Sequence, residues 1–281
     1  MARHDLSAVT QWITAAALEH GQGLPEHVMA RLGISRRSAL ALLNKLVTAQ
    51  WLAREGKSRH LSFVPGRLRQ VVHRYALAGL QEDLPWQRDF APHFSLPPAV
   101  ARMAQHAFSE LLDNVIEHSG GTHVAVSMRT TALHLQLLVS DDGCGVFERI
   151  QQRFGIGDST MAMLELSKGK LTSAPDRHGG HGLFFTSRLA DVFDVHANHR
   201  AFQCRGWDRH SWHPTKAVAR EGTSIYIAIN LDTPRTLDQV LQAHSRSAEG
   251  HGAESTCVPL PLTTGPQTRL VSRTQAKLGA T

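Results

Sequence analysis

The stretch HAFSELLDNVIEH, residues 106–118, decides the fold that this sequence predicts. Residues four apart share a face of a helix, so Glu110 and Asn114 would lie one turn apart. The apolar residues fall on another side and can pack on a sheet: Phe108, Leu111, Leu112, Val115 and Ile116. The sequence therefore predicts an amphipathic helix from about Ala99, with a carboxylate and an amide on its polar face.

This pair of side chains suits a magnesium-nucleotide site. Asn114 offers a neutral oxygen to a Mg²⁺ ion that also binds phosphate oxygens. Glu110 can hold a water molecule for attack on a terminal phosphate, which makes it the candidate general base. The alternative is a solvated polar helix face without a ligand, and the helix by itself favours that alternative.

A second motif follows in LHLQLLVSDDGCGV, residues 133–146. It predicts an apolar strand that ends in Asp141, after which Gly143 and Gly145 form a turn. A carboxylate at a strand end can accept a hydrogen bond from the amino group of adenine, and glycines let the backbone approach the ring closely. An ordinary Asp-Gly turn is the alternative.

A third motif, HGGHGLFFTSRLADVF at 178–193, predicts a helix that begins after a run of glycines. Free amides at the start of a helix bind phosphate, so Gly180, Gly182 and Leu183 are candidate phosphate-site residues. A plain glycine-rich loop is the alternative. The strands expected around these motifs span 122–128, 133–139, 192–197 and 223–229.

The N-terminal segment is basic. Residues 1–75 contain 11 Lys or Arg and 4 Asp or Glu, so they hold more than the whole net charge of +6. Helices are expected at 6–19, at 25–32 and from Ser35 to about Trp51, followed by two short strands around the turn at 55–57. Such an excess of charge favours a polyanionic partner.

Three helices followed by a basic hairpin resemble a winged helix-turn-helix module. The resemblance implies DNA binding through residues 1–66, with the third helix in the major groove and the hairpin on the backbone. It assigns DNA contacts to the first turn of that helix and to the wing: Ser35, Arg36, Arg37, Lys57 and Arg59. A small helical domain with a solvated basic face, or one that contacts proteins, is the alternative.

The order of the motifs over about 100–230 resembles the GHKL superfamily of ATP-binding domains, which includes gyrase and histidine kinases. The pattern is ExxxN at Glu110–Asn114, then DxGxG, then GxGL, then Gly222-Thr223 before a strand. The resemblance implies a two-layer α/β sandwich that binds ATP and Mg²⁺. It assigns Asn114 to Mg²⁺, Asp141 and Thr223 to the adenine region, and Gly180 and Gly182 to the phosphates.

The residues between Val146 and His178 would form the lid of such a domain, where Lys168, Lys170 or Arg177 could reach phosphate; a solvated lid surface is the alternative. The chain has no phosphoacceptor helix hairpin and too few residues for a transducer domain. The nearest type is therefore that of the anti-sigma-factor serine kinases. The tail at 258–278 resembles the opening of a STAS-like domain that has been cut short. The alternative is a chance match in a disordered tail.

The sequence thus predicts an α+β protein in four parts. These are a winged helix-turn-helix at 1–66, a connecting helix and linker at 67–98, a GHKL-type ATP-binding domain at 99–232, and a tail at 233–281. The sequence contains no run of about 18 apolar residues, so no membrane span is predicted. The N-terminus also has no apolar signal-peptide core, and we therefore expect a cytoplasmic protein. The oligomeric state is open, and a dimer is compatible with the sequence.

Two functions of different class remain open. The first is a transcriptional regulator that couples Mg-ATP binding to DNA binding. The second is an ATPase or a serine protein kinase that acts on a STAS-like or sigma-regulatory partner. A zinc site is a weaker alternative, because nitrogen and sulfur ligands crowd into a short segment: His196, His199, Cys204, His210 and His213. A P-loop kinase is a weaker alternative still, since SKGKLT lacks the leading glycine at the needed spacing.

Overall fold

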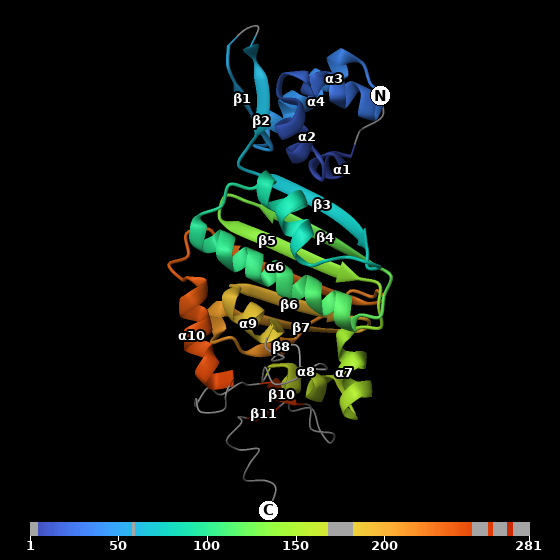
Figure 1. Ribbon diagram of the computed structural model, residues 1–281, viewed down its shortest axis with the longest axis vertical. Helices are drawn as coiled ribbons and strands as arrows, with labels where there is room; N and C mark the ends of the chain where they lie inside the picture. The colour runs from blue at the N-terminus through green and yellow to red at the C-terminus, as the bar shows by residue number, and fades with distance from the viewer. Residues whose placement is uncertain (1–4, 58–59, 168–181, 249–257, 261–268, 272–281) are drawn as a thin grey trace, which may run out of the picture. The chain divides into compact units, whose positions relative to one another are not determined.

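The structure is a computed structural model that describes residues 5–57, 60–167, 182–248, 258–260 and 269–271. The chain divides into two compact units. The first contains residues 1–73, 84–95 and 127–136, and the second contains residues 74–83, 96–126 and 137–281. Figure 1 labels the helices and strands of both units.

The N-terminal part of the first unit consists of four helices, a short 3-10 turn and a hairpin. The elements are α1 (Leu6–Thr10), α2 (Ile13–His20), η1 (Gly21–Gly23), α3 (Leu24–Leu32), α4 (Arg36–Thr48), β1 (Leu52–Glu55) and β2 (Ser62–Pro65). The two strands are antiparallel, with Leu52 opposite Pro65. One buried apolar cluster joins helices and hairpin, and it includes Ile13, Leu24, Val28, Leu43, Leu46 and Phe63. Burial of this cluster supplies the main driving force for folding this part.

The ends of these helices follow from local backbone chemistry. Gly33 ends α3 in the left-handed conformation, at φ +63°. The Ser35 hydroxyl caps α4 by accepting a hydrogen bond from the Ser38 amide at 3.3 Å. Helix α4 ends at Thr48, earlier than expected, because Gln50 adopts φ +64°. The expected helices and hairpin are present, except that residues 6–19 form two helices instead of one. Membership of the winged-helix family stays a prediction.

The prediction of a helix at the start of residues 67–98 is wrong. Residues Arg69–Ala76 form strand β3, in which Val71 is buried. The β-branched Val71 and Val72 and the aromatic Tyr75 favour a strand, and the sheet provides a neighbour for it. The rest of this stretch forms short helical turns: α5 (Asp83–Pro85), η3 (Trp86–Phe90) and η4 (Ala91–His93).

The second unit holds the motif-bearing elements. Its helices are α6 (Pro98–His118), α7 (Val146–Phe154), α8 (Ser159–Ser167), α9 (Gly182–Leu189) and α10 (Leu237–Ala248), and η5 (Gly206–Asp208) is a short turn. The remaining strands of the chain are β4 (His123–Thr130), β5 (His134–Asp141), β6 (Val192–Ala197), β7 (Arg200–Arg205), β8 (Trp212–Pro214), β9 (Thr223–Asn230), β10 (Val258–Leu260) and β11 (Arg269–Val271). The large sheet has the strand order β3-β4-β5-β9-β6-β7-β8.

Helices α6 and α9 lie on one face of this sheet (Figure 1). Alternate residues of β6 are buried, as a sheet covered on one face requires. The face of α6 that packs inward is apolar and contains Val100, Met103, Ala107, Phe108, Leu111 and Leu112. The observed mixture of helices and a large sheet confirms the expected α+β class. In the described ranges, no helix is both long and apolar enough to cross a membrane.

The sequence reading missed strands β7 and β8. Strand β6 pairs antiparallel with both β9 and β7, and β7 pairs with β8. The turn between β6 and β7 contains only two residues, and Asn198 takes φ +49° there. In the tail at 258–278, the structure describes only β10 and β11, which pair antiparallel. The resemblance of this tail to a STAS-like domain therefore stays a prediction.

Candidate functional site

Helix α6 carries the expected polar pair. Pro98 occupies its first turn, where the missing amide hydrogen costs nothing. The Asn114 side-chain nitrogen donates a hydrogen bond to the Glu110 carbonyl oxygen at 2.5 Å. This bond fixes the orientation of the amide and leaves its oxygen as an acceptor. The Glu110 side chain is 35% exposed, and its carboxylate lies 4.0 Å from the imidazole of His106.

The start of α9 lies against this pair. A Cβ atom built on Gly182 would lie 2.0 Å from a carboxylate oxygen of Glu110 and 3.5 Å from the side-chain nitrogen of Asn114. The fold therefore brings Glu110, Asn114 and Gly182 together although up to 72 residues separate them in the sequence. Leu183 follows in the first turn of α9 and is half-buried. Gly180 and the lid residues Lys168, Lys170 and Arg177 lie outside the described residues.

Asp141 ends β5 and is held firmly. One of its carboxylate oxygens accepts hydrogen bonds from the amides of Gly143 at 2.9 Å and Thr223 at 3.1 Å. The residue is 3% exposed, and this burial raises the pKa of its carboxyl group, against the effect of the two amide bonds and of Arg220. Among the described residues, the second carboxylate oxygen accepts no hydrogen bond, so it can serve a ligand.

Gly222 makes this arrangement sterically possible. Its φ is +82°, and a Cβ atom at this position would lie 2.2 Å from the Asp141 carbonyl oxygen. Thr223 follows directly, and its hydroxyl accepts a hydrogen bond from the Val146 amide at 3.0 Å. The structure therefore brings Thr223 beside Asp141, as the motif order predicts.

The glycines after Asp141 have a visible packing role. A Cβ atom on Gly143 would lie 2.2 Å from the carbonyl oxygen of Ser119, and that oxygen accepts a hydrogen bond from the Cys144 amide at 3.0 Å. Gly145 precedes α7 with φ +88°, a conformation that favours glycine. Gly143 thus lets the loop pack against the end of α6, whereas a Cβ atom on Gly145 would meet the side chains of Asn198 and Glu148. The approach of the two glycines to a nucleotide ring stays a prediction.

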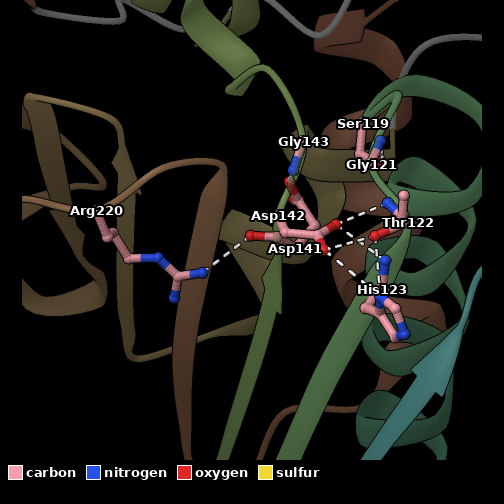
Figure 2. A network of polar contacts seen from close by, with 8 residues as sticks. All are labelled: Ser119, Gly121, Thr122, His123, Asp141, Asp142, Gly143 and Arg220. Atoms are coloured by element: carbon pink, nitrogen blue, oxygen red, sulfur yellow. Dashed lines mark hydrogen bonds and ion pairs between the residues drawn. The ribbon is translucent and has the colours of Figure 1, made fainter.

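Two residues around Asp141 were missed by the sequence reading. Asp142 is exposed and accepts hydrogen bonds from the amides of Thr122 at 2.7 Å and His123 at 2.9 Å, which lower the pKa of its carboxyl group. Arg220 donates a hydrogen bond to the Asp141 carbonyl oxygen at 2.9 Å. Figure 2 shows both contacts around the end of β5. The second acid of DDGCG was a signal for Asp142, whereas no sequence signal pointed to Arg220.

The residues expected to contact DNA lie in the first unit. Ser35 caps α4, Arg37 is exposed at its start, and Lys57 is exposed beyond β1. Arg36 forms an ion pair with Glu26 at 2.8 Å on the surface. Arg59 lies outside the described residues. The structure thus leaves DNA binding a prediction.

The described residues contradict the zinc alternative. They include no group of three or more His, Cys, Asp or Glu side chains arranged to hold a metal ion. Cys204 is buried in β7, and burial raises the pKa of its thiol to about 12. His213 instead hydrogen-bonds Asp208 at 2.7 Å. The five candidate ligands lie on strands and turns of a sheet rather than around a common centre.

Comparison with known protein families identifies the second half of the fold. Residues 99–233 match the model of a family described as histidine kinase-, DNA gyrase B-, and HSP90-like ATPase. No curated protein matches the chain. The matched range begins with α6 and ends just after β9, so it contains every motif of the candidate site. Residues 99–233 are therefore a GHKL-type ATPase domain, and this family binds ATP.

Proposed function

We propose that this chain is a regulator that binds Mg-ATP through residues 99–233 and DNA through residues 1–66, and that nucleotide occupancy changes its affinity for DNA. The observation that carries the nucleotide part is Asp141, a buried carboxylate with one oxygen fixed by two amides and the other left for a ligand. An adenine amino group is a donor of the kind that this second oxygen accepts.

The opposite wall of the site suits the phosphates and their metal. Asn114 directs its amide nitrogen to a backbone carbonyl, so its oxygen is the atom that would hold Mg²⁺. A magnesium ion would neutralise phosphate charge in this place. Gly182 opens α9 beside Asn114, where backbone amides and the helix dipole favour phosphate.

The DNA part is supported by the charge and shape of the first unit. Helix α4 follows α3 through a short turn and carries exposed Arg37 and Lys45. The hairpin β1–β2 adds Arg54, whose guanidinium donates to the Asn44 side chain of α4. This bond ties the wing to the proposed recognition helix and supports a common surface for phosphate contacts.

Calorimetric titration of the full chain with ATP, with and without Mg²⁺, tests the nucleotide part. We expect binding that Mg²⁺ strengthens, with the Mg²⁺ effect lost in Asn114→Ala. An unchanged Mg²⁺ effect in this variant would contradict the metal assignment.

Fluorescence anisotropy with a duplex of mixed sequence, with and without ATP, tests the DNA part. Arg37→Ala should weaken binding at every sequence and reduce the salt slope by about 1. Arg200→Ala, which removes an exposed cation from β7, is the matched control and should leave binding unchanged. Equal DNA affinity with and without ATP would sink the coupling.

A serine kinase or ATPase is the second candidate, and Glu110 is the observation that favours it. Its carboxylate is partly exposed and lies against the first residue of α9. A general base in this position would activate a water molecule or a serine hydroxyl. Phosphate release and labelled-phosphate transfer to a STAS-like protein would separate these activities. Turnover that Glu110→Ala abolishes while ATP binding persists supports the enzyme, and no turnover in the wild type supports the regulator.

A further inference from the structure

Arg220 lies in the loop that leads into β9 and contacts two strands at once. One terminal nitrogen of its guanidinium donates to the Asp141 carbonyl oxygen at 2.9 Å, at the end of β5. The other donates to the Ser224 hydroxyl, at the start of β9. Its Nε donates to the Glu221 carbonyl oxygen at 3.3 Å. The two terminal nitrogens of Arg220 therefore join the strand ends that carry Asp141 and Thr223, while its Nε bonds to its own loop.

This bridge continues across the sheet. The Ser224 hydroxyl lies 2.8 Å from the Ser140 hydroxyl. Successive residues of a strand point to opposite faces, so Ser140 and the buried Asp141 side chain face opposite ways. Arg220 and the two serines thus support the Asp141 backbone from behind, while its carboxylate meets the amides of Gly143 and Thr223. Figure 2 shows Arg220 and the pair Thr122–His123 on opposite sides of the end of β5.

The bridge also sets the charge around Asp141. Of the charged groups in the described part of the chain, the guanidinium of Arg220 favours the ionised form of this carboxylate, and the carboxylate of Asp142 opposes it. Asp142 faces Thr122 and His123, whose ring nitrogen lies 3.6 Å from it. Burial also opposes ionisation of Asp141. The Asp141 carboxylate must be ionised for both of its oxygens to accept hydrogen bonds. The positive charge of Arg220 favours this ionised form and so opposes the effect of burial on the pKa of Asp141.

We propose that Arg220 is a positioning residue for nucleotide recognition, which fixes the Asp141 backbone and keeps its carboxylate in the form that accepts a hydrogen bond from adenine. This role rests on the proposed binding of adenine by Asp141. Arg220 acts through Asp141 and needs no contact with the nucleotide. Because Arg220 is exposed, solvent and salt screen its charge, and a moderate effect is expected.

The test compares three variants of the full chain: Arg220→Gln, Arg220→Lys and Lys216→Gln. Lys216 is an exposed cation of the same loop, four residues away, and is the matched control for loss of charge. ATP affinity is measured by calorimetry at about pH 8 and about pH 5.5, because protonation of a carboxyl group with a raised pKa weakens binding more at the lower pH. Melting temperatures establish that each variant is folded.

In Arg220→Gln, we expect the ratio of its Kd to that of the wild type to rise about threefold from the higher to the lower pH, because loss of the nearby positive charge lets the Asp141 carboxyl group take up a proton more readily. In Arg220→Lys, which keeps the charge and loses the fork, we expect a uniform weakening at both pH values. Lys216→Gln should match the wild type.

The outcomes separate this role from the proposed function. No ATP binding by the wild type overturns both. Binding by the wild type with a Kd ratio for Arg220→Gln that is the same at both pH values overturns the role of Arg220 alone. If Arg220→Gln does not fold, Arg220→Lys decides, because a weakening that grows as the pH falls would contradict the role of the charge.

Discussion

The two ends of the candidate site are held in different ways. At Asp141, two backbone amides hold the buried carboxylate, while the guanidinium of Arg220 and the close approach of Gly222 fix its backbone carbonyl. At Glu110, the carboxylate is partly exposed and lies near the His106 ring and against Gly182, the first residue of α9. The first end is preorganised for recognition before a ligand arrives, which lowers the cost of binding. Under the proposed function, the side chain at the second end can rotate to meet the phosphates.

The substitution with the largest expected effect on this comparison is at Gly222. Gly222→Ala places a methyl group 2.2 Å from the Asp141 carbonyl oxygen in a backbone conformation that disfavours side chains. Because both atoms belong to rigid parts of the fold, we expect a loss of unfolding free energy of about 3 kcal/mol and loss of ATP binding. Urea unfolding and calorimetry measure these effects.

Gly79→Ala is the control for Gly222. Gly79 has φ +76°, but a Cβ atom there meets nothing within 4 Å. The backbone conformation alone should cost about 1 kcal/mol. If both variants lost the same unfolding free energy, the contact of Gly222 with Asp141 would make no contribution to stability.

Asp141→Asn comes next in size. Asparagine keeps an oxygen for the amides of Gly143 and Thr223, but it turns the second position from an acceptor into a donor. We expect little change in stability and a loss of ATP affinity of about 2–3 kcal/mol, because two donors then face each other. ATP affinity equal to that of the wild type would remove Asp141 from the site.

The pH dependence sharpens the comparison further. Burial raises the pKa of Asp141, so this group contributes stability that is complete below its unfolded pKa and is lost as the pH rises through its folded pKa. Binding has the opposite dependence, since the ionised carboxylate is the acceptor. Lowering the pH from 7 toward 5 should therefore weaken ATP binding, beyond any change seen in Asp141→Asn under the same conditions. Identical pH profiles for the two proteins would contradict this account.

The smallest effect on stability is expected at Gly182. A Cβ atom there lies closer to its neighbour than at Gly222, but the neighbour is the end of the Glu110 side chain, which can rotate away. Gly182→Ala should therefore change the unfolding free energy by less than about 1 kcal/mol. A loss as large as that of Gly222→Ala would mean that both ends of the site are equally rigid.

Much of this arrangement follows from local patterns. The apolar stripe of 98–118 specifies α6, and the run LHLQLLV specifies the buried face of β5. The neighbours Thr223 and Asp141, like Gly182 and Glu110, belong to motifs that the sequence analysis singled out, while their roles in one site stay a prediction. Strand β3 was mistaken for a helix, because its alternation is weak and only a neighbouring strand makes it favourable. The contact of Arg220 with Asp141 joins residues 79 apart, and no local pattern encodes it.

The ion pair of Arg36 with Glu26 bears on how the first unit would respond to salt. When a protein binds a nucleic acid, the number of released counterions grows with the number of phosphates that its Lys and Arg side chains neutralise. Arg36 already has an anionic partner at 2.8 Å, so a phosphate that recruits it must displace a carboxylate and exchanges one ion pair for another. Arg37 has no such competitor among the described residues. Of the two adjacent arginines, Arg37 thus offers the larger net gain in electrostatic free energy.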